Sequence, residues 1–140
     1  MSTTHEEITL PRKIVQNLLH HAQQTPELEV CGLISSQDQQ PYRSYAIKNA
    51  ADQPERFFQL DPQEQIQAMA TMRDNNEQLF AIYHSHPTAP ASPSKTDIAL
   101  ANYPEALYLI ISLNTKGIME LRAFKILEEH FTELALRLKN

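Results

Sequence analysis

Cysteine and glycine are scarce in this sequence, and each scarcity excludes a class of site. The 140 residues include one cysteine, Cys31, so the chain cannot form an internal disulfide. Thiolate-rich zinc fingers need several cysteines, so any metal site must be built from histidine and carboxylate side chains. The two glycines, Gly32 and Gly117, are too few for the glycine-rich loops that bind phosphate in P-loop and Rossmann proteins.

Long apolar runs and excess positive charge are also missing. No stretch approaches the roughly 18 apolar residues of a membrane span, and the polar, acidic residues 1–8 do not resemble a secretory signal. The 12 basic and 17 acidic side chains give a net charge of -5, which argues against non-specific nucleic-acid binding. We therefore expect a cytoplasmic protein in a reducing compartment, with neither nucleic-acid nor membrane partners.

The chain is long enough for one domain with a hydrophobic core, and 41% of its residues are apolar. Hydrophobic periodicity and turn residues predict a series of helices and strands. Helices are expected at residues 10–24, 61–74 and 94–102, and strands at residues 30–35, 42–48, 57–60, 79–85, 107–113, 119–127 and 131–138. Turns are expected at 115–117 and 128–130, and the composition of the C-terminal tail would also permit a helix. This order predicts a single α/β or α+β domain over residues 1–140, with a mixed sheet covered by helices.

The pair His84 and His86 is the strongest functional signal. The apolar run at residues 79–83 predicts a buried strand that ends at these histidines. Residues two apart on a strand point to the same face, so both imidazoles project toward one point. Imidazole is the commonest protein ligand for a zinc-like ion, and Asp97 can supply a third ligand. A surface histidine is more often simply solvated, and for this pair alone both interpretations stay open.

Ser94 and Asp97 allow two compatible interpretations. A serine followed three residues later by an acidic residue is typical of a capping box at the start of a helix. A carboxylate in the first helical turn is also held rigidly enough to face a metal ion. The Ser94 hydroxyl, one turn away, is then able to donate to a developing oxyanion.

Glu29 and Cys31 lie at the start of the predicted strand at residues 30–35. Charged groups at strand ends are mostly solvent-exposed, and spacing cannot show whether Glu29 meets His84. If the two meet, a glutamate beside an activated water molecule is the expected general base. Cys31 could act as a nucleophile with a histidine partner, but a thiol in an apolar strand is more often buried and inert.

Taken together, these residues resemble the motif of the JAMM, or MPN+, metalloprotease family. Residues 84–87 read His-x-His-Pro, and Ser94 and Asp97 follow at the spacing of that family. Upstream, Glu29 precedes a Cys-Gly-apolar segment at residues 31–34, as in many bacterial members. Further similar stretches stand at residues 48–50, 56–57 and 61–62, so that the resemblance covers about residues 10–126. Many members have a glycine where this chain has Ser35-Ser36-Gln37, and the long insertions of the eukaryotic deubiquitinating members are missing.

The resemblance implies a cytidine-deaminase-like JAMM fold, with a curved mixed β-sheet flanked by helices. It implies that His84, His86 and Asp97 bind a zinc ion, Zn²⁺. Glu29 would act as general base on the zinc-bound water, and Ser94 would help to stabilise the oxyanion. Minimal bacterial members resemble enzymes that trim adducts from ubiquitin-fold sulfur-carrier proteins ending in Gly-Gly. The implied partner is therefore such a carrier, or a peptide substrate with a glycine-rich C-terminus.

Three functional hypotheses follow. The leading one is a zinc-dependent peptidase or isopeptidase that cleaves next to a Gly-Gly tail. The second is a non-catalytic MPN-type interaction module, against which the retention of all the motif residues argues. The third is a cysteine hydrolase that uses Cys31, whose activity would survive metal chelation. Within the leading hypothesis Glu27 is a rival for the general base, but it stands too early for the family pattern.

Overall fold

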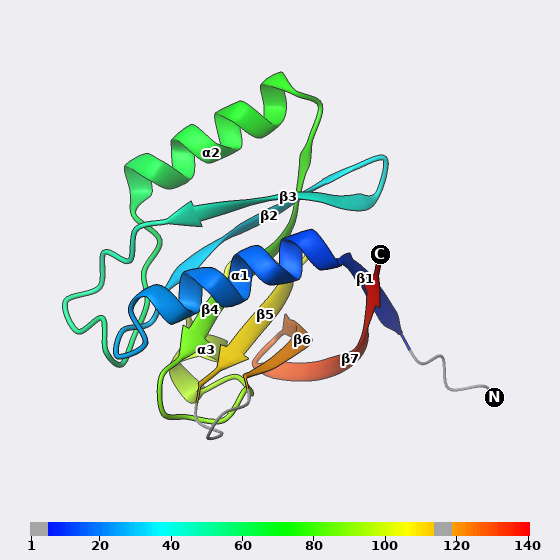
Figure 1. The fold of residues 1–140 in the computed structure, drawn as a ribbon. Helices are drawn as coiled ribbons and strands as arrows, with labels where there is room; N and C mark the ends of the chain where they lie inside the picture. Colours follow the sequence, from blue (N-terminus) through cyan, green and yellow to red (C-terminus); the bar gives the residue numbers. More distant parts are fainter. Residues whose placement is uncertain (1–5, 114–118) are drawn as a thin grey trace.

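A computed structural model describes residues 6–113 and 119–140, which form one curved seven-stranded sheet with helices on both faces (Figure 1). The elements follow in the order β1 (Glu7–Pro11), α1 (Arg12–Gln24), β2 (Cys31–Gln37), β3 (Gln40–Ile47), α2 (Pro62–Asp74), β4 (Gln78–His86), α3 (Lys95–Ala99), β5 (Leu107–Ser112), β6 (Glu120–Leu127) and β7 (His130–Lys139). The strand order is β1-β7-β6-β5-β4-β2-β3. The pairs β1–β7 and β4–β5 are parallel and the other neighbours antiparallel, so the predicted mixed sheet is confirmed.

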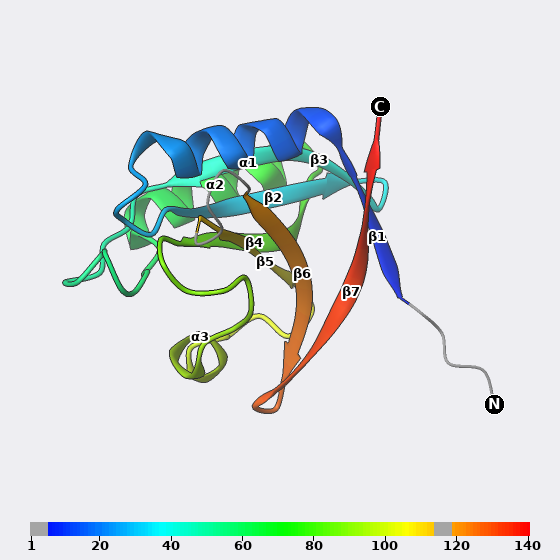
Figure 2. The same ribbon diagram turned by 60° about the horizontal axis from the view of Figure 1, so that its bottom comes forward.

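The helices divide between the two faces of the sheet. The buried side of α1, with Ile14 and Leu18, packs in one core cluster with Tyr83 of β4. Met72 of α2 belongs to a second cluster, together with Ile82 of β4. Figure 2 shows α1 and α3 on opposite sides of the sheet. Because side chains alternate along a strand, residues two and four positions after Ile82 point to the face that α2 and α3 cover.

Several predicted elements differ from the structure at the N-terminal end and around α3. The helix predicted at residues 10–24 begins only at Arg12, because Pro11 has extended dihedrals (φ -60°, ψ 141°) and ends β1, a strand that the sequence did not predict. The helix predicted at 94–102 is the shorter α3, with Ser94 as its N-cap. Pro104 follows closely and disfavours a helical conformation at the residue before it.

The strand predicted at residues 57–60 does not form, and only Leu60 makes an isolated bridge, to Asn49. In this segment the Phe57 carbonyl and the Gln59 amide form hydrogen bonds with the Asn49 side chain and not with a neighbouring strand. The helix predicted to begin at Asp61-Pro62 is confirmed, and the Asp61 side chain accepts a hydrogen bond from the Glu64 amide at 3.0 Å.

Two tight hairpins form without glycine. Asp38 and Gln39 join β2 to β3 with φ values of 52° and 65°, and Glu128 and Glu129 join β6 to β7 with 51° and 67°. Positive φ at both central residues is the geometry of a type I′ turn. The strand interpretation of the C-terminal tail is therefore confirmed as β7, whereas the turn predicted at 115–117 lies outside the described residues.

Gly32 is required where β2 passes between two tyrosines. A Cβ atom at this position would collide with the backbone carbonyl oxygen of Tyr45 and with the ring of Tyr83. The Tyr83 ring cannot move aside easily, since its hydroxyl lies 2.7 Å from Nδ1 of His21. In the part of the chain that the structure describes, no helix is long and apolar enough to cross a membrane.

Candidate metal centre

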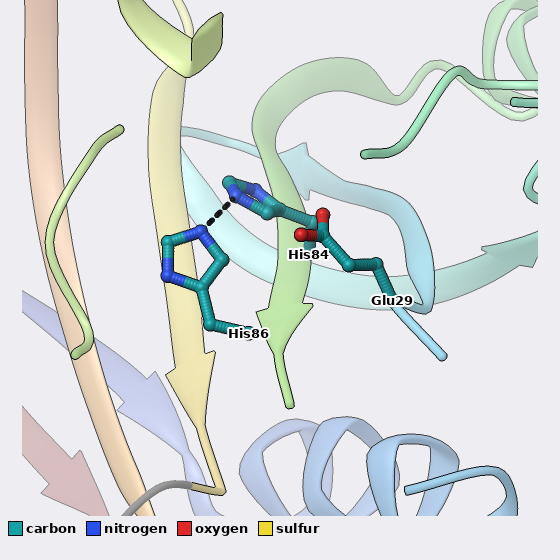
Figure 3. A group of neighbouring side chains, drawn as sticks. All are labelled: Glu29, His84 and His86. Atoms are coloured by element: carbon teal, nitrogen blue, oxygen red, sulfur yellow. Dashed lines mark hydrogen bonds between the residues drawn. The ribbon is translucent and has the colours of Figure 1, made fainter. Parts of the chain in front are cut away.

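The end of β4 brings two imidazoles together on one face of the sheet. β4 is an interior strand, paired with β2 on one side and β5 on the other. His84 and His86 are 1% and 3% exposed, and their Nε2 atoms lie 3.1 Å apart. In Figure 3 a dashed line joins these two ring nitrogens. Both imidazoles project from the face that also carries Ile82, as the spacing of two residues predicts.

Asp97 reaches the same point from the first turn of α3. Its Oδ2 atom lies 3.1 Å from Nε2 of His84 and 3.1 Å from Nε2 of His86. The same oxygen accepts a hydrogen bond from the Ser94 amide at 2.9 Å, and Ser94 Oγ accepts one from the Asp97 amide at 3.0 Å. The capping box and the carboxylate that faces the histidines therefore coexist, and the cap fixes the position of the carboxylate.

Glu29 enters the site from the segment immediately before β2. Its side chain is 6% exposed, and a carboxylate oxygen lies within 4.8 Å of a ring nitrogen of both His84 and His86 (Figure 3). Glu27 is exposed on the preceding turn. The structure thus gathers Glu29, the two histidines and Asp97.

The donor atoms fit a zinc-like ion. A tetrahedral zinc ion holds its ligand atoms about 3.3 Å from one another, because its bonds to nitrogen and oxygen are about 2.0–2.1 Å long. The three separations of 3.1 Å among His84, His86 and Asp97 are close to this value. Nδ1 of His86 donates to the Pro90 carbonyl at 2.7 Å, so its Nε2 keeps the lone pair that a metal needs.

One buried oxygen lacks a partner at this site. In the described part of the chain, Oε1 of Glu29 has no hydrogen-bond partner although it is fully buried. A buried polar atom without a partner costs free energy and calls for an explanation such as an ion or a water molecule. An ion with its bound water supplies that explanation, and the residues present therefore fit a metal centre.

Burial and mutual contacts shift the pKa of each group. Burial raises the pKa of Glu29 to about 8, with the Asp97 carboxylate adding to the effect and His86 opposing it. Burial also opposes charge on Asp97, but the close contacts of its carboxylate with His84 and His86 hold the pKa of Asp97 far below its usual range. Burial lowers the pKa of His84. It acts in the same direction on His86, where contacts with Asp97 and the Pro90 carbonyl outweigh it and raise the pKa.

Cys31 lies opposite His84 in the β2–β4 pairing but offers no nucleophile. The thiol is fully buried and donates to the Ile47 carbonyl at 3.4 Å. Burial, with Glu29 nearby, raises the pKa of Cys31 to about 12. The thiolate form is therefore negligible at neutral pH, which agrees with an inert buried cysteine and removes the chemical basis for a cysteine hydrolase.

A cavity of about 680 Å³ opens between the loop at residues 51–60 and the segment at residues 96–108. Its lining is largely aromatic and aliphatic, and includes Phe57, Phe58, Leu100, Tyr103 and Tyr108. A smaller hollow of about 30 Å³, lined among others by His84 and Asp97, shares Phe57, Phe58, Leu100 and Tyr108 with the cavity. The cavity thus adjoins the metal centre.

Phe58 and Ser85 are parts of the site that the sequence did not reveal. The Phe58 ring stacks on the imidazole of His84, with centroids 4.2 Å apart and planes 18° from parallel. Ser85, between the two histidines, is fully buried and accepts a hydrogen bond from the Val30 amide at 2.9 Å. The one sequence signal for Ser85 is its position between the two histidines. The spacing of the motif residues gives no signal that Phe58 belongs to the site.

Comparison with protein families finds a match over most of the chain. The model of the prokaryotic homologues of the JAB domain matches residues 11–126.

Two curated relatives with enzymatic names are similar over most of their length. The CysO-cysteine peptidase of Mycobacterium tuberculosis (strain H37Rv) is 34% identical over 122 residues, which cover 86% of this chain and 83% of the relative. The desampylase of Haloferax volcanii is 29% identical over 115 residues, which cover 78% of this chain and 83% of the relative. These names support hydrolase activity for this chain.

Solved structures share the fold. A protein from Desulfitobacterium hafniense has a TM-score of 0.85 and 36% identity, over 95% of this chain and 93% of that one. A JAB1/MPN domain protein from Archaeoglobus fulgidus has a TM-score of 0.58 and 16% identity, over 94% and 98% of the two chains, and this likeness concerns the fold alone. The predicted curved mixed sheet flanked by helices is confirmed.

Proposed function

This chain belongs to the prokaryotic JAB-domain family, and we propose that it is a zinc-dependent peptidase or isopeptidase. Its substrate is an amide bond that follows the Gly-Gly tail of a ubiquitin-fold sulfur-carrier protein. The observation that carries the proposal is the convergence of His84, His86 and Asp97 at separations of 3.1 Å, with Glu29 beside them. A zinc ion held by these three ligands would polarise the scissile carbonyl and lower the pKa of a water molecule toward about 7.

Glu29 has the properties of a general base. It is buried, its Oε1 atom has no hydrogen-bond partner among the described residues, and its pKa is raised to about 8. A carboxylate with a pKa near the working pH can take a proton from the attacking water and pass it to the leaving amine. A carboxylate with an ordinary pKa would be a poorer donor in that second step.

Ser94 has a hydroxyl hydrogen available for the transition state. Its oxygen accepts the cap hydrogen bond from the Asp97 amide, which uses a lone pair and not the hydrogen. The residue is exposed at the start of α3, one turn from the carboxylate of Asp97. In this proposal the hydroxyl donates to the oxyanion that develops on the scissile carbonyl.

The shape of the site and the relatives support the choice of substrate. The hollow beside His84 and Asp97 has a volume of about 30 Å³, room for about two water molecules. A glycine residue at the scissile bond suits this restriction. The names CysO-cysteine peptidase and desampylase refer to enzymes that act on conjugates, and one further relative, from Thermus thermophilus, is named a probable TtuB-protein conjugate cleaving protease. We place the reaction in the cytoplasm, where a single unpaired thiol suits a reducing environment.

A cleavage assay tests the proposal. The substrate is a ubiquitin-fold sulfur carrier whose C-terminal glycine carboxyl is joined to cysteine, and mass spectrometry follows the release of cysteine. We expect cleavage that a chelator abolishes and that zinc restores. Glu29→Gln should lower kcat by about 10²–10⁴-fold with zinc retained.

Glu27→Gln is the matched control, since Glu27 is an exposed glutamate two positions earlier, and it should leave the rate unchanged. Cleavage that survives chelation would contradict a metal-dependent mechanism. A zinc-loaded protein that cleaves neither the cysteine conjugate nor a peptide conjugate would instead support the non-catalytic interaction module.

A further inference from the structure

We propose that Asn49 is a positioning residue, whose side-chain amide holds the backbone of Glu29 and the Phe57–Phe58 wall in one fixed relation to the histidine pair. This inference rests on the proposed function, because it assigns to Asn49 a role that acts through the general base. Asn49 lies just after β3, and in the described part of the chain its side chain makes no hydrogen bond to either histidine.

All four hydrogen-bonding positions of the Asn49 amide are used. Its Nδ2 donates to the Glu29 carbonyl and to the Phe57 carbonyl, each at 2.9 Å. Its Oδ1 accepts from the amides of Ala51 and Gln59, each at 3.0 Å. An asparagine amide offers two donor hydrogens and two acceptor lone pairs, so no other residue of this length satisfies the same set of contacts.

Three of these hydrogen bonds lie within the loop at residues 49–59, and the fourth connects the loop to another segment. The bonds to Ala51, Phe57 and Gln59 close residues 49–59 around the side chain, and the Ala50 amide adds a bond to the Gln59 carbonyl at 2.7 Å. The bond to the Glu29 carbonyl crosses to the segment before β2. That second connection is not needed to close the loop.

The loop at residues 49–59 makes a second hydrogen bond to the Glu29 backbone, through Pro54. The Glu29 amide donates to the Pro54 carbonyl at 2.8 Å. The backbone of Glu29 is therefore held by the loop at both its N–H and its C=O, once directly by Asn49 and once by the loop that Asn49 closes. A carboxylate on a backbone fixed at both ends loses little freedom when it meets the attacking water.

The same loop reaches the metal side of the site. Phe57, whose carbonyl Asn49 holds, precedes Phe58, and the Phe58 ring stacks on His84. Asn49 thus links the base to the ring that packs on a metal ligand. A small displacement of this loop changes both the position of Glu29 and the packing of His84.

A double-mutant cycle tests the inference, with the carrier–cysteine conjugate as substrate and zinc-loaded protein. Asn49→Ala should lower kcat by about 10²-fold in the wild-type background, because misplacement of a catalytic group by about 1 Å costs this much. In the Glu29→Gln background the same change should lower the residual rate by less than about 3-fold, since two residues that act as a unit are not additive. A residue with a merely structural role would lower the rate by the same factor in both backgrounds.

Asn49→Asp is the second variant. It keeps the two acceptor contacts to the loop and loses both donors, including the one to Glu29, so it tests the crossing bond even if Asn49→Ala fails to fold. Asn75→Ala is the matched control, because the Asn75 amide donates to the Thr71 carbonyl at the end of α2, away from the site. This control should keep the wild-type rate.

A readout without turnover accompanies the kinetics. In metal-free protein, hydrogen exchange at the Glu29 amide should accelerate in Asn49→Asp and not in Asn75→Ala. Equal factors in the two arms of the cycle, or unchanged kcat in both Asn49 variants, would overturn the inference. A Glu29→Gln variant with the full wild-type rate would instead overturn the proposed function, whatever the Asn49 variants do.

Discussion

Val30 and Ser85 form two hydrogen bonds with each other in the interior of the protein. The Val30 amide donates to Ser85 Oγ at 2.9 Å, and the Ser85 amide donates to the Val30 carbonyl at 3.0 Å. Val30 follows the candidate base Glu29, and Ser85 lies between the two histidines. These two hydrogen bonds therefore fix the distance between the base and the metal ligands.

Ser85→Ala should destabilise the protein by about 1–3 kcal/mol. The change leaves the buried Val30 amide without a partner, and an unsatisfied buried donor costs that amount. Urea unfolding of the metal-free proteins measures the effect. Ser44→Ala is the control, because the Ser44 hydroxyl accepts a long hydrogen bond of 3.4 Å from the exposed Asn17 side chain, and this change should alter stability by less than about 0.5 kcal/mol. Equal stabilities for the two variants would contradict the importance of this bond.

Phe58→Ala should weaken zinc binding by about 10-fold. The Phe58 ring packs flat on His84, and groups that orient a ligand contribute about this much to metal affinity. Competition with a chromophoric chelator measures the dissociation constant. Phe131→Ala serves as control, since Phe131 packs on Phe124 of β6 instead of on the site. An unchanged affinity in Phe58→Ala would show that the stack does not orient His84.

The metal-free protein should lose stability as pH rises through the range in which Glu29 titrates. Burial raises the pKa of Glu29 from its ordinary value of 4.5 to about 8, so between these values the folded state holds a proton that the unfolded state has released. The stabilising contribution of the Glu29 proton to the free energy of unfolding is then fully present below about pH 4.5, and it is lost as pH rises toward 8. Glu29→Gln does not titrate and should flatten the stability profile between pH 5 and 8, as followed by urea unfolding. Parallel profiles for wild type and variant would contradict the raised pKa.

Replacing Glu128-Glu129 by Asn-Gly should stabilise the β6–β7 hairpin by about 1 kcal/mol. Both glutamates hold positive φ values, of 51° and 67°, which cost free energy for residues other than glycine or asparagine. Thermal unfolding gives the change. The same pair placed at residues 52–53, in a loop for which no positive φ is found among the described residues, should bring no such gain. A lower melting temperature in the hairpin variant would refute the turn assignment.

Elements with strong local patterns could be predicted from the sequence. The Asp61-Pro62 start of α2 and the alternation of β7 are both confirmed, because each depends on neighbouring residues. β1 was missed because its partner β7 lies at the other end of the chain, with Glu7 opposite Ala135. Residues 57–60 are predicted as a strand, but the structure uses the Asn49 side chain in place of a partner strand.

The site residues also differ in how far the sequence predicts them. That His84 and His86 share a face follows from their spacing on one strand. Their meeting with Glu29 depends on the β2–β4 pairing, in which Cys31 stands opposite His84, and no local pattern encodes this. The general-base role of Glu29 is predicted by the family resemblance and not by hydrophobic periodicity. Neither source predicts that Phe58 and Asn49 belong to the site.

The most direct test of the account is the metal content of purified wild type, Asp97→Asn and Asp61→Asn. An asparagine at position 97 can still accept the cap hydrogen bond from the Ser94 amide, so this variant separates the helix cap from the metal ligand. Asp61 caps α2 and lies outside the site, which makes its variant the matched control. After zinc is supplied and the excess is dialysed away, elemental analysis should find about one zinc per chain in wild type and Asp61→Asn, and almost none in Asp97→Asn. A folded wild type without zinc, or full zinc retention in Asp97→Asn, would contradict the proposed metal centre.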